Sequence, residues 1–151
     1  MSNTITFDIR CYGDENARNG FKNELRFLNG EWAYEGEGFS GFSGSIPCAC
    51  IHTQEWIEFS KRNNSTIGLF TDNYMSEYAE VLTIRNGEVI HNKAYDYYSF
   101  EDPWAFGDDY LDLVGEGSTI ELEELCRKAL KTTRTKESEG CFFDLKILKK
   151  V

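Results

Sequence analysis

The sequence predicts an α+β fold, mainly an antiparallel sheet with two or three helices packed on one face. Three observations predict it. Apolar and polar residues alternate strictly over Ile5–Cys11, which is typical of a half-buried strand. Apolar residues recur at helical spacing after Asp14 and again after Ser118. Asn86-Gly87, the favoured pair for a two-residue turn, lies between two alternating runs and indicates a β-hairpin.

The first half of the chain predicts the order strand, helix, strand, strand, helix, strand. After the first strand, Asp14 is a suitable N-cap for a helix to about Leu28, where Asn29-Gly30 supplies a stop. A strand through Trp32 and Tyr34 follows, and then a flexible Gly-rich loop to residue 45. The remaining elements are a short strand over Ile46–Ile51, a helix over Gln54–Lys61 capped by Thr53, and a strand over Thr66–Phe70.

The Asn86-Gly87 turn implies a register for the predicted hairpin. Two opposite-charge pairs and two apolar pairs then lie directly opposite each other, which supports that register. The pairs are Arg85 with Glu88, Ile84 with Val89, Glu80 with Lys93, and Tyr78 with Tyr95; His91 then faces Leu82, and Glu77 faces Asp96 as a like-charge pair.

The last third of the chain is expected to begin with an irregular, acidic and aromatic segment over residues 97–117. Ser118-Thr119-Ile120-Glu121 matches a capping box and predicts a helix over Thr119–Thr132. A polar loop over residues 133–140 and a terminal strand over Cys141–Lys150 complete the prediction. The 151 residues are expected to form a single domain, in which residues 118–151 supply the last helix and strand.

Composition excludes several classes of protein. A chain that is 40% hydrophobic can bury a core, and its formal net charge of −10 disfavours direct binding of nucleic acid. No apolar run is long enough for a membrane span, and the first residues show no export signal. The five cysteines are odd in number and scattered, so a reduced, cytoplasmic protein with buried thiols is expected.

The negative charge is concentrated in one segment. Ten of the 33 residues from Ala94 to Cys126 are Asp or Glu, and none is Lys or Arg. The formal charge of this segment, −10, therefore equals the net charge of the whole chain. Large aromatic residues are interleaved with these acids, a combination that suits the binding of a basic protein. The alternative is that the aromatic residues are core and the acids are only its solvated side.

The leading hypothesis is therefore a non-enzymatic inhibitor without a cofactor. It would bind a basic partner, such as a nuclease or a nucleic-acid-binding protein, in the manner of an immunity or anti-defence protein. The predicted partner-binding residues are Glu101, Asp102, Trp104, Asp108, Asp109 and Asp112.

Two other functions are compatible with the sequence. Carboxylate pairs such as Asp108-Asp109 or Glu77 with Asp96 could bind a divalent cation, so a metal-dependent hydrolase is one alternative. A self-associating structural protein, using the edge strand of the hairpin and exposed aromatic residues, is the other. Cys48, Cys50 and His52 are zinc-ligand types, but alternate residues of a strand lie about 6.6–6.8 Å apart and do not converge on one ion.

A glycine pattern in the Gly-rich stretch resembles a nucleotide-binding motif by chance. Gly36, Gly38 and Gly41 have the spacing of a dinucleotide-binding fingerprint, but no strand–helix–strand unit with parallel strands follows them.

The predicted strand and helix order over residues 4–70 is that of a ferredoxin-like unit. Together with the hairpin Ile84–Val89, it resembles the YubB-like ferredoxin-like domains of plasmid and phage proteins, over about residues 4–96. The shared features are a short first strand, a helix with a Phe, and an Asn-Gly-Glu-Val hairpin. The resemblance implies a mobile-element setting and no particular chemistry, and the Gly-rich stretch 36–44 and the acidic segment depart from it.

Overall fold

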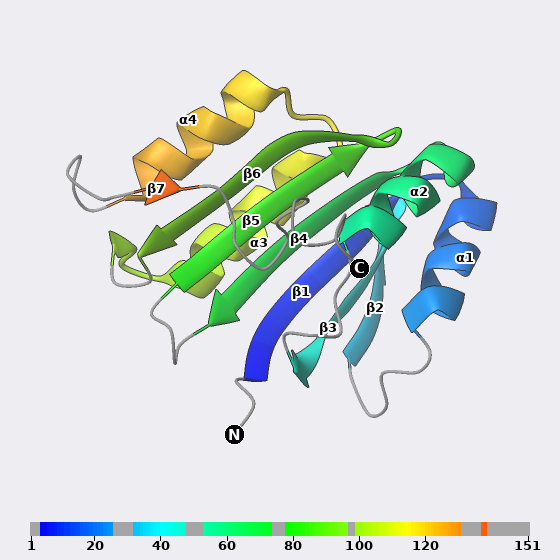
Figure 1. Cartoon of the computed structure of the whole chain (residues 1–151), viewed down its shortest axis with the longest axis horizontal. Helices are drawn as coiled ribbons and strands as arrows, with labels where there is room; N and C mark the ends of the chain where they lie inside the picture. Colours follow the sequence, from blue (N-terminus) through cyan, green and yellow to red (C-terminus); the bar gives the residue numbers. More distant parts are fainter. Residues whose placement is uncertain are drawn as a thin grey trace.

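The computed structural model describes residues 4–25, 32–47, 53–73, 78–96, 99–130 and 137–138. These residues form an antiparallel sheet with the strand order β2-β3-β1-β4-β5-β6-β7, together with four helices (Figure 1). The strands are β1 (Thr4–Tyr12), β2 (Trp32–Gly36), β3 (Phe39–Pro47), β4 (Thr66–Asn73), β5 (Tyr78–Arg85), β6 (Glu88–Asp96) and β7 (Glu137–Ser138). The helices are α1 (Glu15–Leu25), α2 (Thr53–Asn63), α3 (Pro103–Val114) and α4 (Thr119–Ala129).

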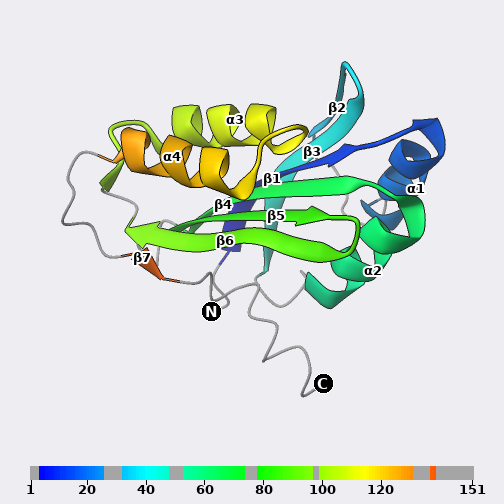
Figure 2. The same cartoon turned by 90° about the horizontal axis from the view of Figure 1, so that it is seen from above.

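The α+β class and the antiparallel sheet are confirmed, but the helices cover both faces of the sheet instead of one. Helices α1 and α2 lie on one face, and α3 and α4 lie on the other (Figure 2). The central strands are accordingly apolar on both sides: Leu69 of β4 belongs to the core beneath α1 and α2, and the next residue, Phe70, belongs to the core beneath α3. Of the two helices in the second layer, the sequence predicted α4 but not α3, because residues 97–117 were expected to be irregular.

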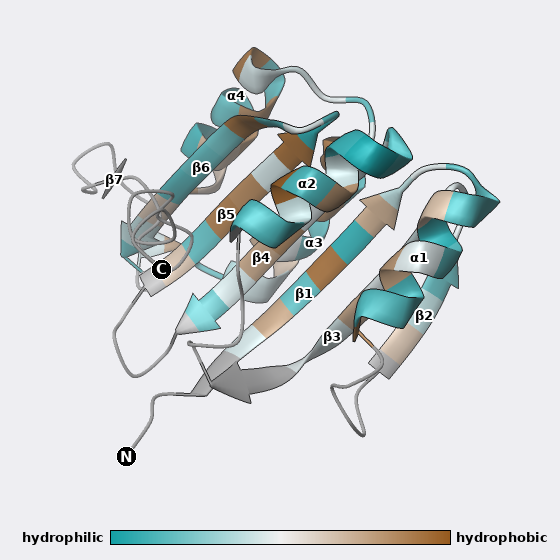
Figure 3. Ribbon diagram, turned by 45° about the vertical axis from the view of Figure 1, so that its right-hand side comes forward, coloured by the Kyte–Doolittle hydropathy of each residue, from teal (hydrophilic) through white to brown (hydrophobic). Residues whose placement is uncertain are grey.

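Two apolar clusters hold these layers together. Figure 3 shows polar and apolar residues alternating along β1, whose Phe7, Ile9 and Cys11 face the α1–α2 side. On the other face, Phe106 and Tyr110 of α3 pack against β4, β5 and β6. Each cluster keeps its helices against the sheet by removing apolar surface from water.

The predicted order of elements in the first half of the chain is confirmed. At the start of α1, the Asp14 carboxylate accepts a hydrogen bond from the backbone N–H of Ala17 at 2.8 Å, so the predicted N-cap is confirmed as well. The predicted end of this helix at Leu28, and its stop at Asn29-Gly30, lie outside the described residues. Helix α2 extends two residues beyond its predicted end, to Asn63.

The expected Gly-rich loop is wrong, because Phe39–Pro47 is strand β3, paired with both β2 and β1. The chain turns at Gly38, which has a positive φ of 77°. Gly41 lies opposite Tyr34, and a Cβ at this glycine would come within 2.2 Å of the tyrosine ring. Glycine here serves close ring packing and not flexibility. Residues 48–51 of the predicted strand Ile46–Ile51 lie outside the described residues.

The β5–β6 hairpin has the predicted turn, with φ of 52° at Asn86 and 83° at Gly87. The first two predicted pairs, Arg85 with Glu88 and Ile84 with Val89, are confirmed. Beyond them the predicted register is wrong, because a bulge between Thr83 and Ile84 shifts the pairing by one residue. The observed pairs are Thr83 with His91, Glu80 with Ala94, and Tyr78 with Asp96.

Helix α3 replaces most of the segment that was expected to be irregular. Phe106, Tyr110 and Val114 are buried at a spacing of four residues, which is one face of a helix. Two helix-weakening features, a glycine at position 107 and a run of Asp residues, obscure this pattern in the sequence. The helix predicted from Thr119 is confirmed as α4, although it ends at Ala129 and not at Thr132, because Leu130 is already extended. Both hydrogen bonds of the Ser118–Glu121 capping box are present at 3.1 Å.

The chain beyond α4 is described only at β7, which pairs with β6. The predicted terminal strand Cys141–Lys150 and most of the predicted loop over residues 133–140 lie outside the described residues. Within the described part of the chain, no helix has the length and apolar character needed to cross a bilayer.

Candidate functional site

Helices α3 and α4 direct their acidic residues away from the sheet. Both helices bury their apolar sides against the same sheet face, so their opposite sides form one outer surface (Figure 2). We call this surface the acidic face. Its exposed carboxylates belong to Glu101, Asp102, Asp108, Asp109, Asp112, Glu116, Glu121 and Glu124.

Two of the predicted partner-binding residues lie where α3 begins. Asp102 is the N-cap, and its carboxylate accepts a hydrogen bond from the backbone N–H of Ala105 at 3.1 Å. Glu101 precedes it and is exposed. Both acids lie near the positive end of the helix dipole, so Asp102 stabilises the helix in addition to any role with a partner.

Trp104 was predicted to anchor a partner, but its side chain packs largely against β4. Its indole N–H donates a hydrogen bond to the Asp72 carboxylate at 3.1 Å, and its ring meets Phe70 edge to face at 5.0 Å between centroids. These contacts hold the first turn of α3 on β4. The side chain is half-buried, so only part of the ring is accessible to a partner.

The other three predicted residues lie along the exposed side of α3. Asp108 and Asp112 are one turn apart, and Asp109 lies beside them. Asp112 accepts a hydrogen bond from the Arg10 guanidinium at 2.6 Å. Within the described part of the chain, the side chains of Asp108 and Asp109 have neither a hydrogen bond nor an ion pair, so their charge is uncompensated at short range.

Arg10, on β1, is the residue that sequence analysis missed. Its side chain is nearly buried, and it donates hydrogen bonds to the hydroxyls of Tyr34 at 3.0 Å and Tyr12 at 3.2 Å besides the bond to Asp112. The Tyr34 hydroxyl in turn donates to Asp8. Arg10 therefore connects α3 to β1 and β2, and its positive charge compensates part of the negative charge of the acidic face.

A weak signal for this network exists in the sequence. Asp8 and Arg10 occupy the polar positions of the alternating first strand, and alternation alone does not show that this polar face is covered. This face of β1 is half-buried because α3 lies above β1 and β4, a contact between elements that are far apart in the sequence.

Two carboxyl groups beneath α3 have pKa values above their ordinary range. Burial raises the pKa of Asp8, and the negative charge of Asp108 adds to this effect, while the hydrogen bond from Tyr34 and the charge of Arg10 oppose it. Burial also raises the pKa of Asp72, and the hydrogen bond from Trp104 opposes it. One Asp72 oxygen is buried without a hydrogen-bond partner in the described residues.

Asp72→Asn is expected to stabilise the protein at pH 7 by up to about 1 kcal/mol, or about 2–4 °C in Tm. The pKa of Asp72 is higher in the folded protein than in the unfolded chain. The contribution of Asp72 to the free energy of unfolding is therefore fully present below pH 3.8, and it is lost as the pH rises through the folded pKa. Asparagine keeps an acceptor for Trp104 and carries no charge to bury. Thermal unfolding followed at pH 7 and at pH 3.5 tests this: the difference between variant and wild type should shrink at the lower pH. A variant that is less stable at pH 7 would contradict it.

Helix α4 extends the acidic face. Glu121 accepts a hydrogen bond from the backbone N–H of Ser118, and Glu123 pairs with Arg127 at 3.4 Å across one turn. Glu124 is exposed. Negative groups thus occupy the first turns of α4 and basic groups its last turn, which suits the helix dipole.

No metal centre is found among the described residues, because no three or more His, Cys, Asp or Glu side chains are grouped to hold an ion. Cys48, Cys50, His52 and Glu77 lie outside those residues. His91 is buried and hydrogen-bonded to the Tyr110 hydroxyl at 3.0 Å, as expected for a core histidine. The metal-dependent hydrolase therefore has no ligand set in the described part of the chain.

Comparisons of the chain with protein-family models, with curated proteins and with solved structures gave no match.

Proposed function

We propose that this protein is a non-enzymatic, acidic binding module that inhibits or sequesters a basic protein, such as a nuclease or a nucleic-acid-binding defence protein. The partner would contact the acidic face through Glu101, Asp102, Asp108, Asp109 and Asp112, with Trp104 at its margin. The supporting observation is that exposed carboxylates of two helices share one outer surface of the molecule.

The fixed positions of α3 and α4 favour a binding surface over the alternative that the acids are only the solvated side of the core. Both helices are capped and packed on one sheet, so the backbone positions that carry the carboxylates are set before a partner arrives. Pre-organised charge accelerates association with a basic surface and limits the entropy lost on binding. An irregular acidic segment, which the sequence predicted over residues 97–117, would lack this advantage.

The setting that we propose is the cytosol of a host that carries mobile elements. Two buried cysteines, Cys11 and Cys126, are free thiols, in keeping with a reducing compartment. The order β2-β3-β1-β4, with α1 and α2 on one face, supports a ferredoxin-like unit within residues 4–96. The resemblance to YubB-like domains is part of this proposal.

The test is a binding assay against a panel of purified basic nucleases, with two variants that remove four charges each. The front variant D108N/D109N/E116Q/E124Q removes carboxylates from α3, α4 and the turn between them. The back variant E15Q/E24Q/E55Q/E58Q removes exposed carboxylates from α1 and α2, on the opposite side of the sheet. We expect the front variant to weaken binding at least tenfold and the back variant to leave it within about twofold.

Isothermal titration calorimetry at about 50 mM salt measures both effects, and circular dichroism checks that each variant is folded. If the two variants weaken binding equally, only net charge matters and the acidic face is not the binding surface. If no basic protein of the panel binds with a Kd below about 10 µM, the proposal fails.

A further inference from the structure

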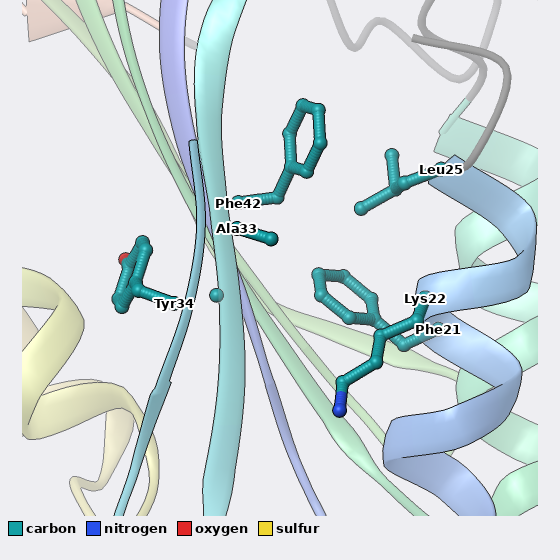
Figure 4. A pocket seen from close by; sticks show the side chains of 7 residues that line it. Phe21, Lys22, Leu25, Ala33, Tyr34 and Phe42 are labelled. Carbon is teal, nitrogen blue, oxygen red and sulfur yellow. The ribbon is translucent and has the colours of Figure 1, made fainter. Parts of the chain in front are cut away.

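A pocket lies between α1 and the β2–β3 hairpin, on the side of the sheet opposite the acidic face. Its volume is about 150 Å³. Figure 4 shows that Phe21 and Leu25 reach it from α1, and that Ala33 and Phe42 reach it from the hairpin. Tyr34 and Gly41 complete the described lining, although the Tyr34 ring points to the other face of the sheet, where its hydroxyl meets Arg10.

The walls of the pocket are apolar and already in place. Phe21, Leu25 and Phe42 are buried and belong to the core beneath α1 and α2, so their positions are set by packing. Ala33 is exposed, and its short side chain reaches the pocket from β2. Aromatic surface that faces such a recess gains contacts when an apolar molecule of matching shape enters.

The charged side chain in the described lining of the pocket, Lys22, already has a partner. Lys22 lines the pocket and forms an ion pair with Glu35, which also accepts a hydrogen bond from the Ser40 hydroxyl at 2.8 Å. The guanidinium of Arg18 lies 3.9 Å from the same carboxylate. Lys22 already pairs with Glu35. A charged ligand would therefore have to displace Glu35, or give up its hydration without gaining an ion pair in exchange.

We propose that this pocket binds a neutral, apolar small molecule of the size of a single six-membered ring. An apolar cavity of about 150 Å³ accommodates one benzene-sized molecule. Sites for larger ligands have volumes of roughly 300–1,000 Å³, so the size excludes them. This inference does not rest on the proposed function, because the pocket and the acidic face lie in different layers.

The test is a titration of the ¹⁵N-labelled protein with toluene, followed by amide chemical shifts. Saturable shifts at Ala33 and Phe42 are expected, and benzoate, the charged analogue, should bind at least tenfold more weakly. Ala33→Leu places a larger side chain in the pocket from β2 and should weaken toluene binding at least tenfold. Ala105→Leu makes the same change at an exposed alanine of α3 and should leave binding unchanged.

Three results would overturn the proposal. Absence of saturable shifts with toluene shows that the pocket does not take an apolar ring. Equal binding to wild type and Ala33→Leu places the toluene elsewhere. Stronger binding of benzoate than of toluene rejects a neutral ligand.

Discussion

Gly107→Val is expected to lower the free energy of unfolding by about 3 kcal/mol, although glycine is a poor helix former and its replacement within a helix ordinarily stabilises. A Cβ at position 107 would lie 2.7 Å from the Phe70 ring, which is closer than real Cβ contacts. Helix α3 crosses β4 at this point, so the glycine sets how closely the two elements approach.

The Phe70 ring has no room to move away. It is fully buried and lies edge to face with Trp104, at 5.0 Å, and with Phe106, at 6.1 Å. The nearest Phe70 atoms also include the first atom of the ring, which shifts only if the whole side chain changes rotamer. The helix must therefore lift from the sheet, and the core beneath α3 loses contacts.

Urea unfolding followed by tryptophan fluorescence measures this effect. Ala105→Val, two residues earlier on the exposed side of the same helix, is the matched control and should cost less than about 1 kcal/mol. Gly107→Ala should also destabilise, by less than Gly107→Val. A stabilising Gly107→Ala would show that helix propensity outweighs the contact with Phe70 and that α3 packs differently.

Arg10→Met is expected to cost about 2 kcal/mol at pH 7, the second largest effect. The guanidinium donates to three side chains while it is nearly buried, so its removal leaves the hydroxyls of Tyr34 and Tyr12 with fewer partners. Asp8 loses the positive charge that opposes the rise of its pKa. Methionine keeps the apolar stem of the side chain, so the change reports mainly on the polar contacts.

The other member of the same ion pair is the control. The Asp112 side chain is 69% exposed, and Asp112→Asn should cost less than about 1 kcal/mol, since water replaces the lost contact. Denaturant titrations of the two variants at pH 7 compare them directly. Equal costs would mean that Arg10 contributes only through Asp112, which the hydrogen bonds to the two tyrosines argue against.

The elements that could be predicted from the sequence are those with a local cause. The alternation of β1, the capping box of α4 and the Asn86-Gly87 turn each depend on residues that are neighbours in the chain. The bulge beyond the turn was not predicted, because no local pattern in the sequence marks the position of the extra residue in β6.

The exposure of the carboxylates on the acidic face follows from composition, since charged groups without partners stay in water. The Arg10 network could not be predicted in the same way. Its members come from β1, β2 and α3, which are far apart in sequence, and only the sheet order brings them together. The inward packing of Trp104 likewise depends on β4 lying beneath the start of α3.

The association rate as a function of salt tests the central claim most directly. With the nuclease of the panel that binds most tightly, stopped-flow rates for the wild type and the back variant E15Q/E24Q/E55Q/E58Q should be similar and fall steeply between about 50 and 300 mM salt. The front variant D108N/D109N/E116Q/E124Q should associate about tenfold more slowly at low salt and depend on salt only weakly. Identical salt dependence for all three proteins would contradict a binding surface on α3 and α4.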